Sequence, residues 1–355
     1  MHTRRRSKQK TENQMNTALR KRCSNFGTSI LLMGAIACGS LIGTLSGSTG
    51  ESLGSLVDYT VLTLVSLLFF ELRLESLRAS RANLRFIAVA WIANFVLIPA
   101  IGFAVATVFL TGKPLFFTGL VIYFMAPCTD WFLGFTRMAK GNASLGASLI
   151  PINMISEILL FPLYLTLFTR WQTGSLVPAA SGTLTKWFLI PFIVAVTLHY
   201  LLRLLLPSRT FDRLLDLVGR TIPLVIAALV VEIFAANIPT LRDHVAVFGL
   251  ILVAVFIFFL STYLLGEGIS RVFRFDYPEH ALLAMTTAAR NAPFMLGGTA
   301  AAIPNQPLIY AALIIGMLVE FPHLTALKHI LLRKRAASFH QAPPSVEVVS
   351  HASAD

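Results

Sequence analysis

The sequence predicts an all-α polytopic membrane protein of ten transmembrane helices, arranged as two inverted five-helix repeats with broken crossing helices 4 and 9. Three observations lead to this fold class. Hydrophobic residues make up 55% of the chain and charged residues only 13%, whereas soluble domains carry about twice that charge. Apolar runs recur, each near the ~20 residues that a membrane-spanning helix needs. Polar interruptions occur at matching places in the two halves.

Ten apolar runs predict the spans, which cover residues 28–46, 56–72, 83–110, 115–137, 144–168, 184–206, 217–237, 244–268, 279–302 and 307–331. The second and seventh runs are the least apolar, because Glu71 closes one and Glu232 lies inside the other. The predicted divisions are a basic cytoplasmic tail (1–27), a first five-helix repeat (28–168), a second inverted five-helix repeat (184–331) and a disordered cytoplasmic tail (337–355). Because each repeat has an odd number of spans, the second enters the membrane from the opposite side.

The placement of basic residues tests this count of spans. The formal net charge is +12, but the arginines and lysines lie in short loops beside apolar runs, which is a topology signal. Of the 29 Lys and Arg residues, 24 fall on one side of the membrane and 4 on the other, with Arg290 inside a span. The sequence therefore predicts a multi-pass membrane protein with both termini cytoplasmic, and no nucleic-acid partner.

Two spans are interrupted by proline and polar residues. The fourth contains "APCTD" around Pro127, and the ninth contains "TTAARNAP" around Pro293. Paired broken helices in corresponding positions point to the substrate site of a transporter, because unwound backbone in a membrane is tolerated only where it lines a protein-walled cavity. The simpler alternative is that each proline only kinks its span, as we expect for Pro99.

Five ionisable residues lie deep in the predicted spans: Asp130, Glu157, Glu232, Arg290 and Glu320. A charge there is costly and needs a partner, water or a proton. If the broken helices cross, Asp130 and Arg290 meet near the midplane, either to neutralise an empty substrate site or as a static salt bridge. Glu157 and Glu320 are candidates for carrying a coupling proton, because burial favours the neutral form of a carboxyl group. The alternative for both is a hydrogen bond between spans.

Cys128, Thr129 and Asn291 adjoin the breaks. A free cysteine is usually a small buried hydrophobe, but helix-end N–H groups and a nearby arginine stabilise a thiolate, which suits a soft solute such as trivalent arsenic. Asn291 is either a ligand or a hydrogen-bonding contact between helices. No two histidines have metal-ligand spacing within a span, so neither a metal site, a cofactor nor an enzyme is expected.

At these motifs the chain resembles the bile acid/arsenite/riboflavin transporter superfamily, over nearly all ten spans. The segments "APCTDWFLGFTRMAKGN", "TTAARNAP" and "GMLVEFPHL" look like the bacterial arsenic-resistance (arsenite permease) branch of these bile acid:sodium symporter-like proteins. The resemblance implies that Cys128 contacts arsenite and that Glu320 is the carboxylate of the last span. It also implies a panel domain of spans 1, 2, 6 and 7 beside a core domain that holds the crossed spans 4 and 9.

The chain departs from this pattern at the ion and substrate positions. Sodium-coupled bile-acid carriers have a Ser-Asn pair, a Glu and a Gln where this chain has Phe132, Leu133, Thr286 and Arg290. A fixed cation at that place argues against sodium coupling. Arsenite permeases usually have Ser in place of Arg290 and an apolar residue in place of Asp130, so these two residues mark a sub-branch.

With this resemblance, the sequence predicts a secondary active transporter of a bacterial inner membrane that works by alternating access. The leading activity is arsenite or arsenical efflux, coupled to protons rather than sodium. The alternative is an uptake symporter for an organic anion, bile-acid-like or a small carboxylate, with Arg290 as the anion ligand. The predicted substrate-binding residues are Cys128 (the candidate As(III) ligand), Thr129, Asp130, Arg290 and Asn291. The predicted ion-coupling residues are Asp130, Glu157 and Glu320, and the helix breaks are at Pro127 and Pro293. The expected partners are the lipid bilayer, the small solute and H⁺.

Overall fold

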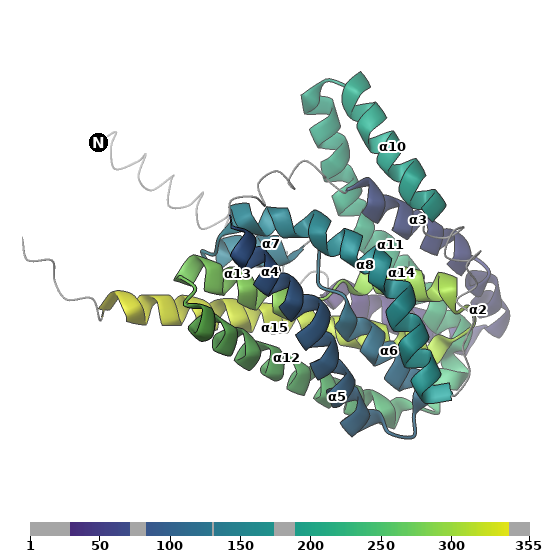
Figure 1. Ribbon diagram of the computed structural model, residues 1–355. Helices are drawn as coiled ribbons and strands as arrows, with labels where there is room; N and C mark the ends of the chain where they lie inside the picture. The colour runs from purple at the N-terminus through teal and green to yellow at the C-terminus, as the bar shows by residue number, and fades with distance from the viewer. Residues whose placement is uncertain (1–28, 72–82, 130, 174–188, 341–355) are drawn as a thin grey trace, which may run out of the picture.

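The computed structural model describes residues 29–71, 83–129, 131–173 and 189–340, and every regular element in these ranges is a helix (Figure 1). The predicted N-terminal tail, most of the predicted C-terminal tail and Asp130 lie outside the described residues. In chain order the helices are Ser29–Leu45, α2 (Gly47–Gly54), α3 (Val57–Phe70), α4 (Leu84–Ile92), the π-helical turn η2 (Ala93–Leu97), α5 (Ile98–Leu110), α6 (Pro114–Met125), α7 (Trp131–Met138), α8 (Ala143–Thr173), α10 (Ile190–Leu205), α11 (Ser208–Arg242), α12 (Val245–Phe273), α13 (Tyr277–Ala288), α14 (Ala292–Ala302) and α15 (Pro307–His340).

Several helices have the length and composition of membrane spans. Five are long and apolar enough to cross a membrane: Leu84–Leu110, Ala143–Tyr164, Ser208–Arg242, Val245–Phe273 and Pro307–Ala337. A sixth candidate is the pair α2 and α3, which are bent by 41° at the break between them. Ser29–Leu45, α6 and α10 are shorter apolar helices. The chain is therefore an all-helical polytopic membrane protein, as its composition predicts.

The helices depart from the predicted apolar runs in several places. Gly47–Gly54 forms α2 between the first two predicted spans, and Ser46 caps it by accepting a hydrogen bond from the Thr49 N–H. α11 begins at Ser208 rather than at residue 217, so arginines predicted for a loop lie on its first turns. Their polar side chains end the apolar run, but arginine is a good helix former and the helical hydrogen bonds continue. α15 continues to His340, past the predicted start of the tail at 337.

The helices α6, α13 and α14, which end or begin at the two breaks, form the centre of the bundle. Every residue of α6 from Phe116 to Met125 is buried, and so is every residue from Ala281 to Ala301 in α13, α14 and the break between them. Helices that are covered on all sides belong to the interior of a bundle. Polar groups at the two breaks are therefore shielded from lipid and from bulk water.

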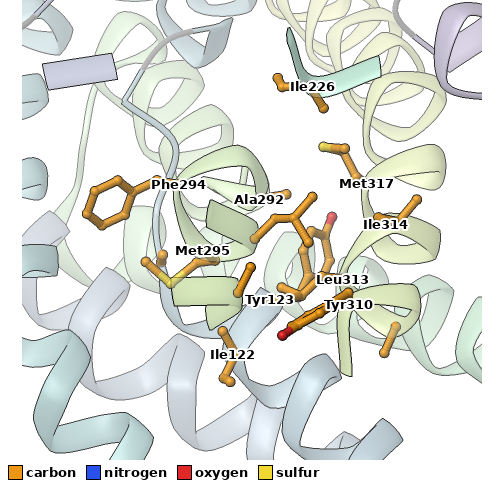
Figure 2. Close-up of a cluster of buried hydrophobic side chains, with 14 of the residues drawn as sticks. Ile122, Tyr123, Ile226, Ala292, Phe294, Met295, Tyr310, Leu313, Ile314 and Met317 are labelled. Atoms are coloured by element: carbon orange, nitrogen blue, oxygen red, sulfur yellow. The ribbon is translucent and has the colours of Figure 1, made fainter. Parts of the chain in front are cut away.

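α15 packs closely against α6 because glycines lie at the contact. A Cβ atom on Gly119 would lie 2.3 Å from the Ile309 carbonyl oxygen, and one on Gly316 would lie 2.7 Å from the Tyr123 ring. Small residues let membrane helices approach at backbone distance. Figure 2 shows the apolar side chains around this contact, including those of Tyr123, Met295 and Leu313.

The span Leu84–Leu110 contains the π-helical turn η2 just before Pro99. Proline has no N–H to donate to the carbonyl four residues earlier, which here belongs to Phe95. The Tyr164 hydroxyl of α8 donates a hydrogen bond to that carbonyl instead. π-turns inside helices often occur at functional sites. The position of η2 therefore indicates a functional site between α8 and the breaks.

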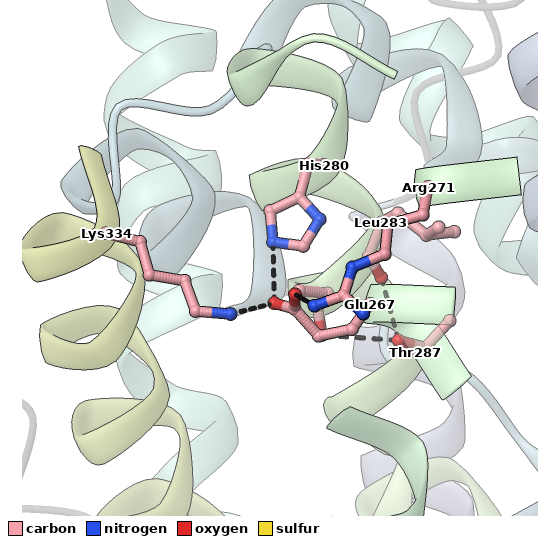
Figure 3. A network of polar contacts seen from close by, with 7 residues as sticks. Glu267, Arg271, His280, Leu283, Thr287 and Lys334 are labelled. Carbon is pink, nitrogen blue, oxygen red and sulfur yellow. Dashed lines mark hydrogen bonds and ion pairs between the residues drawn. The ribbon is translucent and has the colours of Figure 1, made fainter. Parts of the chain in front are cut away.

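An ionic cluster around Glu267 joins α12, α13 and α15 (Figure 3). The Glu267 carboxylate lies 3.1 Å from His280 Nε2, 2.6 Å from Lys334 Nζ and 3.8 Å from Arg271 Nη2. A carboxylate near the end of a span needs only solvation by a loop. This one instead fixes three helices relative to one another at one end of the bundle.

Candidate functional site

The break between α6 and α7 lies against the break between α13 and α14. Pro127 in the first and Arg290 in the second form an antiparallel β-bridge. These contacts satisfy backbone groups that the broken helices leave without intrahelical partners. Two hydrogen bonds of 2.9 Å close the contact, from the Cys128 N–H to the Ala289 carbonyl and from the Asn291 N–H to the Ala126 carbonyl.

Arg290 closes the C-terminal ends of both half-helices. Its side chain is fully buried. Nη1 lies 3.1 Å from the Phe124 carbonyl of α6, and Nη2 lies 3.0 Å and 2.8 Å from the carbonyls of Thr286 and Thr287 in α13. In an unbroken helix those two carbonyls would accept the N–H groups of residues 290 and 291, which bond elsewhere here. The guanidinium therefore places a positive charge at the negative ends of two helix dipoles.

Glu320 of α15 accepts a hydrogen bond from the Arg290 backbone N–H, which has no intrahelical acceptor because of the second break. It is fully buried, and its Oε1 lies 2.9 Å from the Arg290 backbone nitrogen and 2.7 Å from the Trp131 indole nitrogen. Its Oε2 accepts a hydrogen bond of 3.3 Å from the Tyr123 hydroxyl. The sequence predicts Glu320 but not these two aromatic donors. The sequence does contain a hint of both, because a tyrosine or tryptophan inside an apolar run needs a hydrogen-bond partner for its O–H or N–H group.

Asn291 joins the second break to the first and to α8. Its Nδ2 lies 2.7 Å from Glu157 Oε2 and 3.2 Å from Thr129 Oγ1. All three residues are buried, so these hydrogen bonds take the place of water. The structure thus brings together Thr129, Glu157 and Asn291, which the sequence singles out from three different spans.

Several buried amide atoms close to this contact have no hydrogen-bond partner among the described residues. Asn153 lies one turn before Glu157 on α8, and both its Oδ1 and its Nδ2 are unpartnered there. The Oδ1 atoms of Asn291 and Asn94 also have no hydrogen-bond partner among the described residues. Asn94 Nδ2, by contrast, donates a hydrogen bond of 3.1 Å to Thr286 Oγ1. A buried amide without partners is costly. A polar solute or an ordered water would gain hydrogen bonds at this place.

A small cavity lies beside the breaks, between η2, α8 and α14. Its volume of about 10 Å³ is room for one water molecule. Glu157 contributes the charged group of its wall, and the rest of the wall is aromatic or apolar. The lining residues are Phe95, Met125, Ala126, Glu157, Phe161, Tyr164 and Met295.

The remaining predicted site residues lie around the same contact. Cys128 is buried and packs in an apolar cluster that includes Phe86 and Phe132, and it is not among the residues that line the small cavity. Pro293 occupies the first turn of α14, where a helix has no use for the N–H that proline lacks. Because Asp130 lies outside the described residues, its pairing with Arg290 stays a prediction.

Comparison with known proteins shows the family to which the chain belongs. Residues 60–267, more than half of the chain, match the Sodium Bile acid symporter family. The chain is 22% identical over 284 residues to the arsenical-resistance protein Acr3 of Corynebacterium glutamicum, an alignment that covers 74% of each protein. It is 30% identical over 132 residues to the probable sodium/metabolite cotransporter BASS2, chloroplastic, of Oryza sativa subsp. japonica, over 36% of this chain and 30% of that one. Members of the matched family are transporters rather than enzymes. The chain belongs to the sodium bile acid symporter family and is a membrane transporter of that type.

Proposed function

We propose that this protein is an inner-membrane secondary active transporter that moves a small solute by alternating access about the contact between the two breaks. We also propose ten spans in two inverted repeats, residues 28–168 and 184–331, with the tails 1–27 and 337–355 in the cytoplasm. The observation that carries the proposal is the backbone pairing of the two breaks in the middle of a buried bundle. Carriers place their solute at such paired interruptions, where unwound backbone and helix ends can bind it.

Arsenite efflux is the activity that the site supports best. Arsenous acid is uncharged at neutral pH and both donates and accepts hydrogen bonds. The unpartnered amide atoms of Asn153 and Asn291 suit such a solute, and Thr129 adds a hydroxyl. Cys128 lies on the same break and supplies the thiol that trivalent arsenic prefers. The likeness to a protein named for arsenical resistance supports this choice.

Protons are the coupling ions that the geometry favours. The guanidinium of Arg290 already fills the group of carbonyl oxygens at the ends of α6 and α13, and arginine keeps its charge in proteins. A free sodium ion would be repelled there. Glu157 lines the small cavity beside the breaks and is hydrogen-bonded to the neutral Asn291 amide, whereas the hydrogen bonds of Glu320 hold Tyr123, Trp131 and the Arg290 N–H at the crossing. Of the proposed coupling residues Asp130, Glu157 and Glu320, we therefore place Glu157 first.

Uptake of an organic anion is the second candidate. Two observations favour it: a buried cation lies at the breaks, and one relative is named a probable sodium/metabolite cotransporter. Arg290 would have to bind the carboxylate of the solute. It donates to three backbone carbonyls, so an anion would have to replace hydrogen bonds that hold two helix ends together. This cost ranks the anion below arsenite.

A growth assay tests the arsenite proposal. A bacterial strain that lacks its own arsenite efflux systems is given the wild-type protein, Cys128→Ser or Cys38→Ser, with equal amounts in the membrane checked by immunoblot. Cys38 is the matched control because its thiol is exposed. We expect the wild type and Cys38→Ser to restore growth on arsenite, and Cys128→Ser to fail. No rescue by the wild type contradicts the substrate, and rescue by Cys128→Ser contradicts only the role of the thiol.

A further inference from the structure

Glu232 is a buried carboxyl group that the proposed transport site does not use. It lies in the membrane-spanning part of α11 and is 6% exposed. Its Oε1 accepts a hydrogen bond of 2.8 Å from the Thr60 hydroxyl of α3. Its Oε2 is buried and has no hydrogen-bond partner in the part of the chain that the structure describes.

Among the residues that the structure describes, no basic side chain forms an ion pair with Glu232. The neighbouring residue Val231 turns its carbonyl toward Gly39, where a Cβ atom would lie 2.6 Å from that oxygen, so the helix Ser29–Leu45 covers this side of α11 closely. Neither an ion pair nor a second hydrogen bond reaches the Glu232 carboxyl group within the described ranges. The titratable residues on Ser29–Leu45, α2, α3 and the first half of α15 are Cys38, Glu51, Asp58, Tyr59, Tyr310 and Glu320. Those on α10, which also packs against α3 and α11, are His199, Tyr200 and Arg203. His199 contacts Phe211, so this group lies toward the Ser208 end of α11, far along the helix from Glu232.

An ionised carboxylate in this place would be poorly compensated. One neutral hydroxyl replaces only a fraction of the hydration that a carboxylate loses on burial, and such a group neutralises itself by taking up a proton. We infer that Glu232 is a proton-binding site of the bundle formed by Ser29–Leu45, α2, α3 and α11, separate from the crossing breaks. In the conformation seen here it holds its proton, with the carbonyl oxygen accepting from Thr60.

A break in α11 lies just beyond this site. Asn237 has non-helical backbone angles (φ −126°, ψ 17°), and its Nδ2 donates to the Ile233 carbonyl. Pro239 follows and has no N–H for the Ala235 carbonyl, which packs instead against Gly43 and Gly50. A Cβ atom on either glycine would lie within 2.4 Å of that oxygen (2.2 Å and 2.4 Å). The helix C-terminal to Glu232 therefore lacks the Pro239-to-Ala235 hydrogen bond and is bent at Asn237. Movement of α11 away from α3 at this place would open the Glu232 carboxyl group to water.

Infrared spectroscopy of the full-length protein in lipid tests the inference. A protonated carboxylic acid has a C=O stretch above the amide I band, and an ionised one does not. The wild type is compared at neutral pH with Glu232→Gln, which keeps the shape and the acceptor for Thr60. The matched control is Glu51→Gln, which replaces an exposed carboxylate on α2.

We expect the wild-type minus Glu232→Gln spectrum to contain one protonated C=O band that the wild-type minus Glu51→Gln spectrum lacks. If Glu232→Gln does not fold, Thr60→Val gives the same answer, because loss of the hydroxyl donor shifts that band to higher frequency. A carboxylate band lost in Glu232→Gln, or a C=O band unmoved in Thr60→Val, overturns the assignment. The measurement needs no substrate, so its failure is distinct from failure of the transport proposal.

Discussion

The crossing of the two breaks depends on a few residues that replace lost backbone hydrogen bonds. The N–H of Arg290 bonds to Glu320, and the Arg290 guanidinium bonds to three carbonyls at the ends of α6 and α13. Both side chains are fully buried, so water cannot substitute for them. At this scale Arg290 serves as a shared cap for two helices, which explains why a cation lies in the middle of an apolar bundle.

Replacing Arg290 by lysine should destabilise the protein. A single ammonium group on a flexible stem cannot reach carbonyls of two helices as a planar guanidinium does. At least one charge-assisted hydrogen bond is lost, worth about 1.5–3 kcal/mol. Thermal unfolding followed by tryptophan fluorescence should show a lower midpoint for Arg290→Lys. Arg85→Lys is the control, because Arg85 donates to the Phe273 carbonyl at an exposed place; equal midpoints for the two variants would contradict the capping role.

Replacing Glu320 by alanine should be more damaging than replacing it by glutamine. Alanine leaves the Arg290 N–H and the Trp131 indole N–H buried without acceptors, at a cost of about 1–3 kcal/mol each. Glutamine keeps one oxygen that can accept from both. The yield of folded protein and the unfolding midpoint measure the difference. If Glu320→Ala unfolds at the same temperature as Glu320→Gln, the carboxyl group does not hold the crossing together.

Among the elements, α6 and α15 show how the centre is kept compact. Their approach depends on Gly119 and Gly316, whose missing side chains leave space for the Ile309 carbonyl and the Tyr123 ring. This contact also positions Tyr123, which donates a hydrogen bond to Glu320, four residues after Gly316 on α15. A helix contact thus sets the geometry of the polar centre.

Substitution of Gly119 by alanine should separate α6 from α15. The new Cβ would meet the Ile309 carbonyl at 2.3 Å, and overpacking of this kind costs about 1–3 kcal/mol. Gly249→Ala in α12 is the matched control, because a Cβ atom there meets nothing within 4 Å and alanine is the better helix former by up to ~1 kcal/mol. The unfolding midpoint should fall for Gly119→Ala and stay or rise for Gly249→Ala. A fall for both, or for neither, would argue against a tight contact.

The breaks could be predicted because proline and charged residues are conspicuous in an apolar run, as at Pro127 and Arg290. Their partners could not be predicted in the same way. Arg290 bonds to backbone carbonyls, and every residue has one, so no sequence feature marks Phe124 as an acceptor. The π-turn η2 has no sequence signature beyond Pro99. The hydropathy pattern does not predict α2, because polar residues interrupt the apolar run there without preventing a helix. Propensity and capping act over a few residues, whereas these contacts join segments far apart in the chain.

For the whole molecule, the small cavity is the feature that bears on transport. Its volume of about 10 Å³ is too small for a solute larger than water, so α8 and the breaks must move apart to admit one. The hydrogen bond between Glu157 and Asn291 joins α8 to the second break, so it lies where α8 and the breaks would separate. Solute entry would therefore change the surroundings of Glu157, which is the condition for coupling the solute to a proton.

The most direct test of this account is arsenite flux in proteoliposomes that contain the purified protein, with pH and sodium gradients imposed separately. We predict that an acidic lumen raises arsenite uptake severalfold in exchange for protons, and that replacing potassium by sodium on either side changes nothing. Glu157→Gln should abolish the response to pH while the protein stays folded. Uptake that follows a sodium gradient and ignores pH would contradict the central claim.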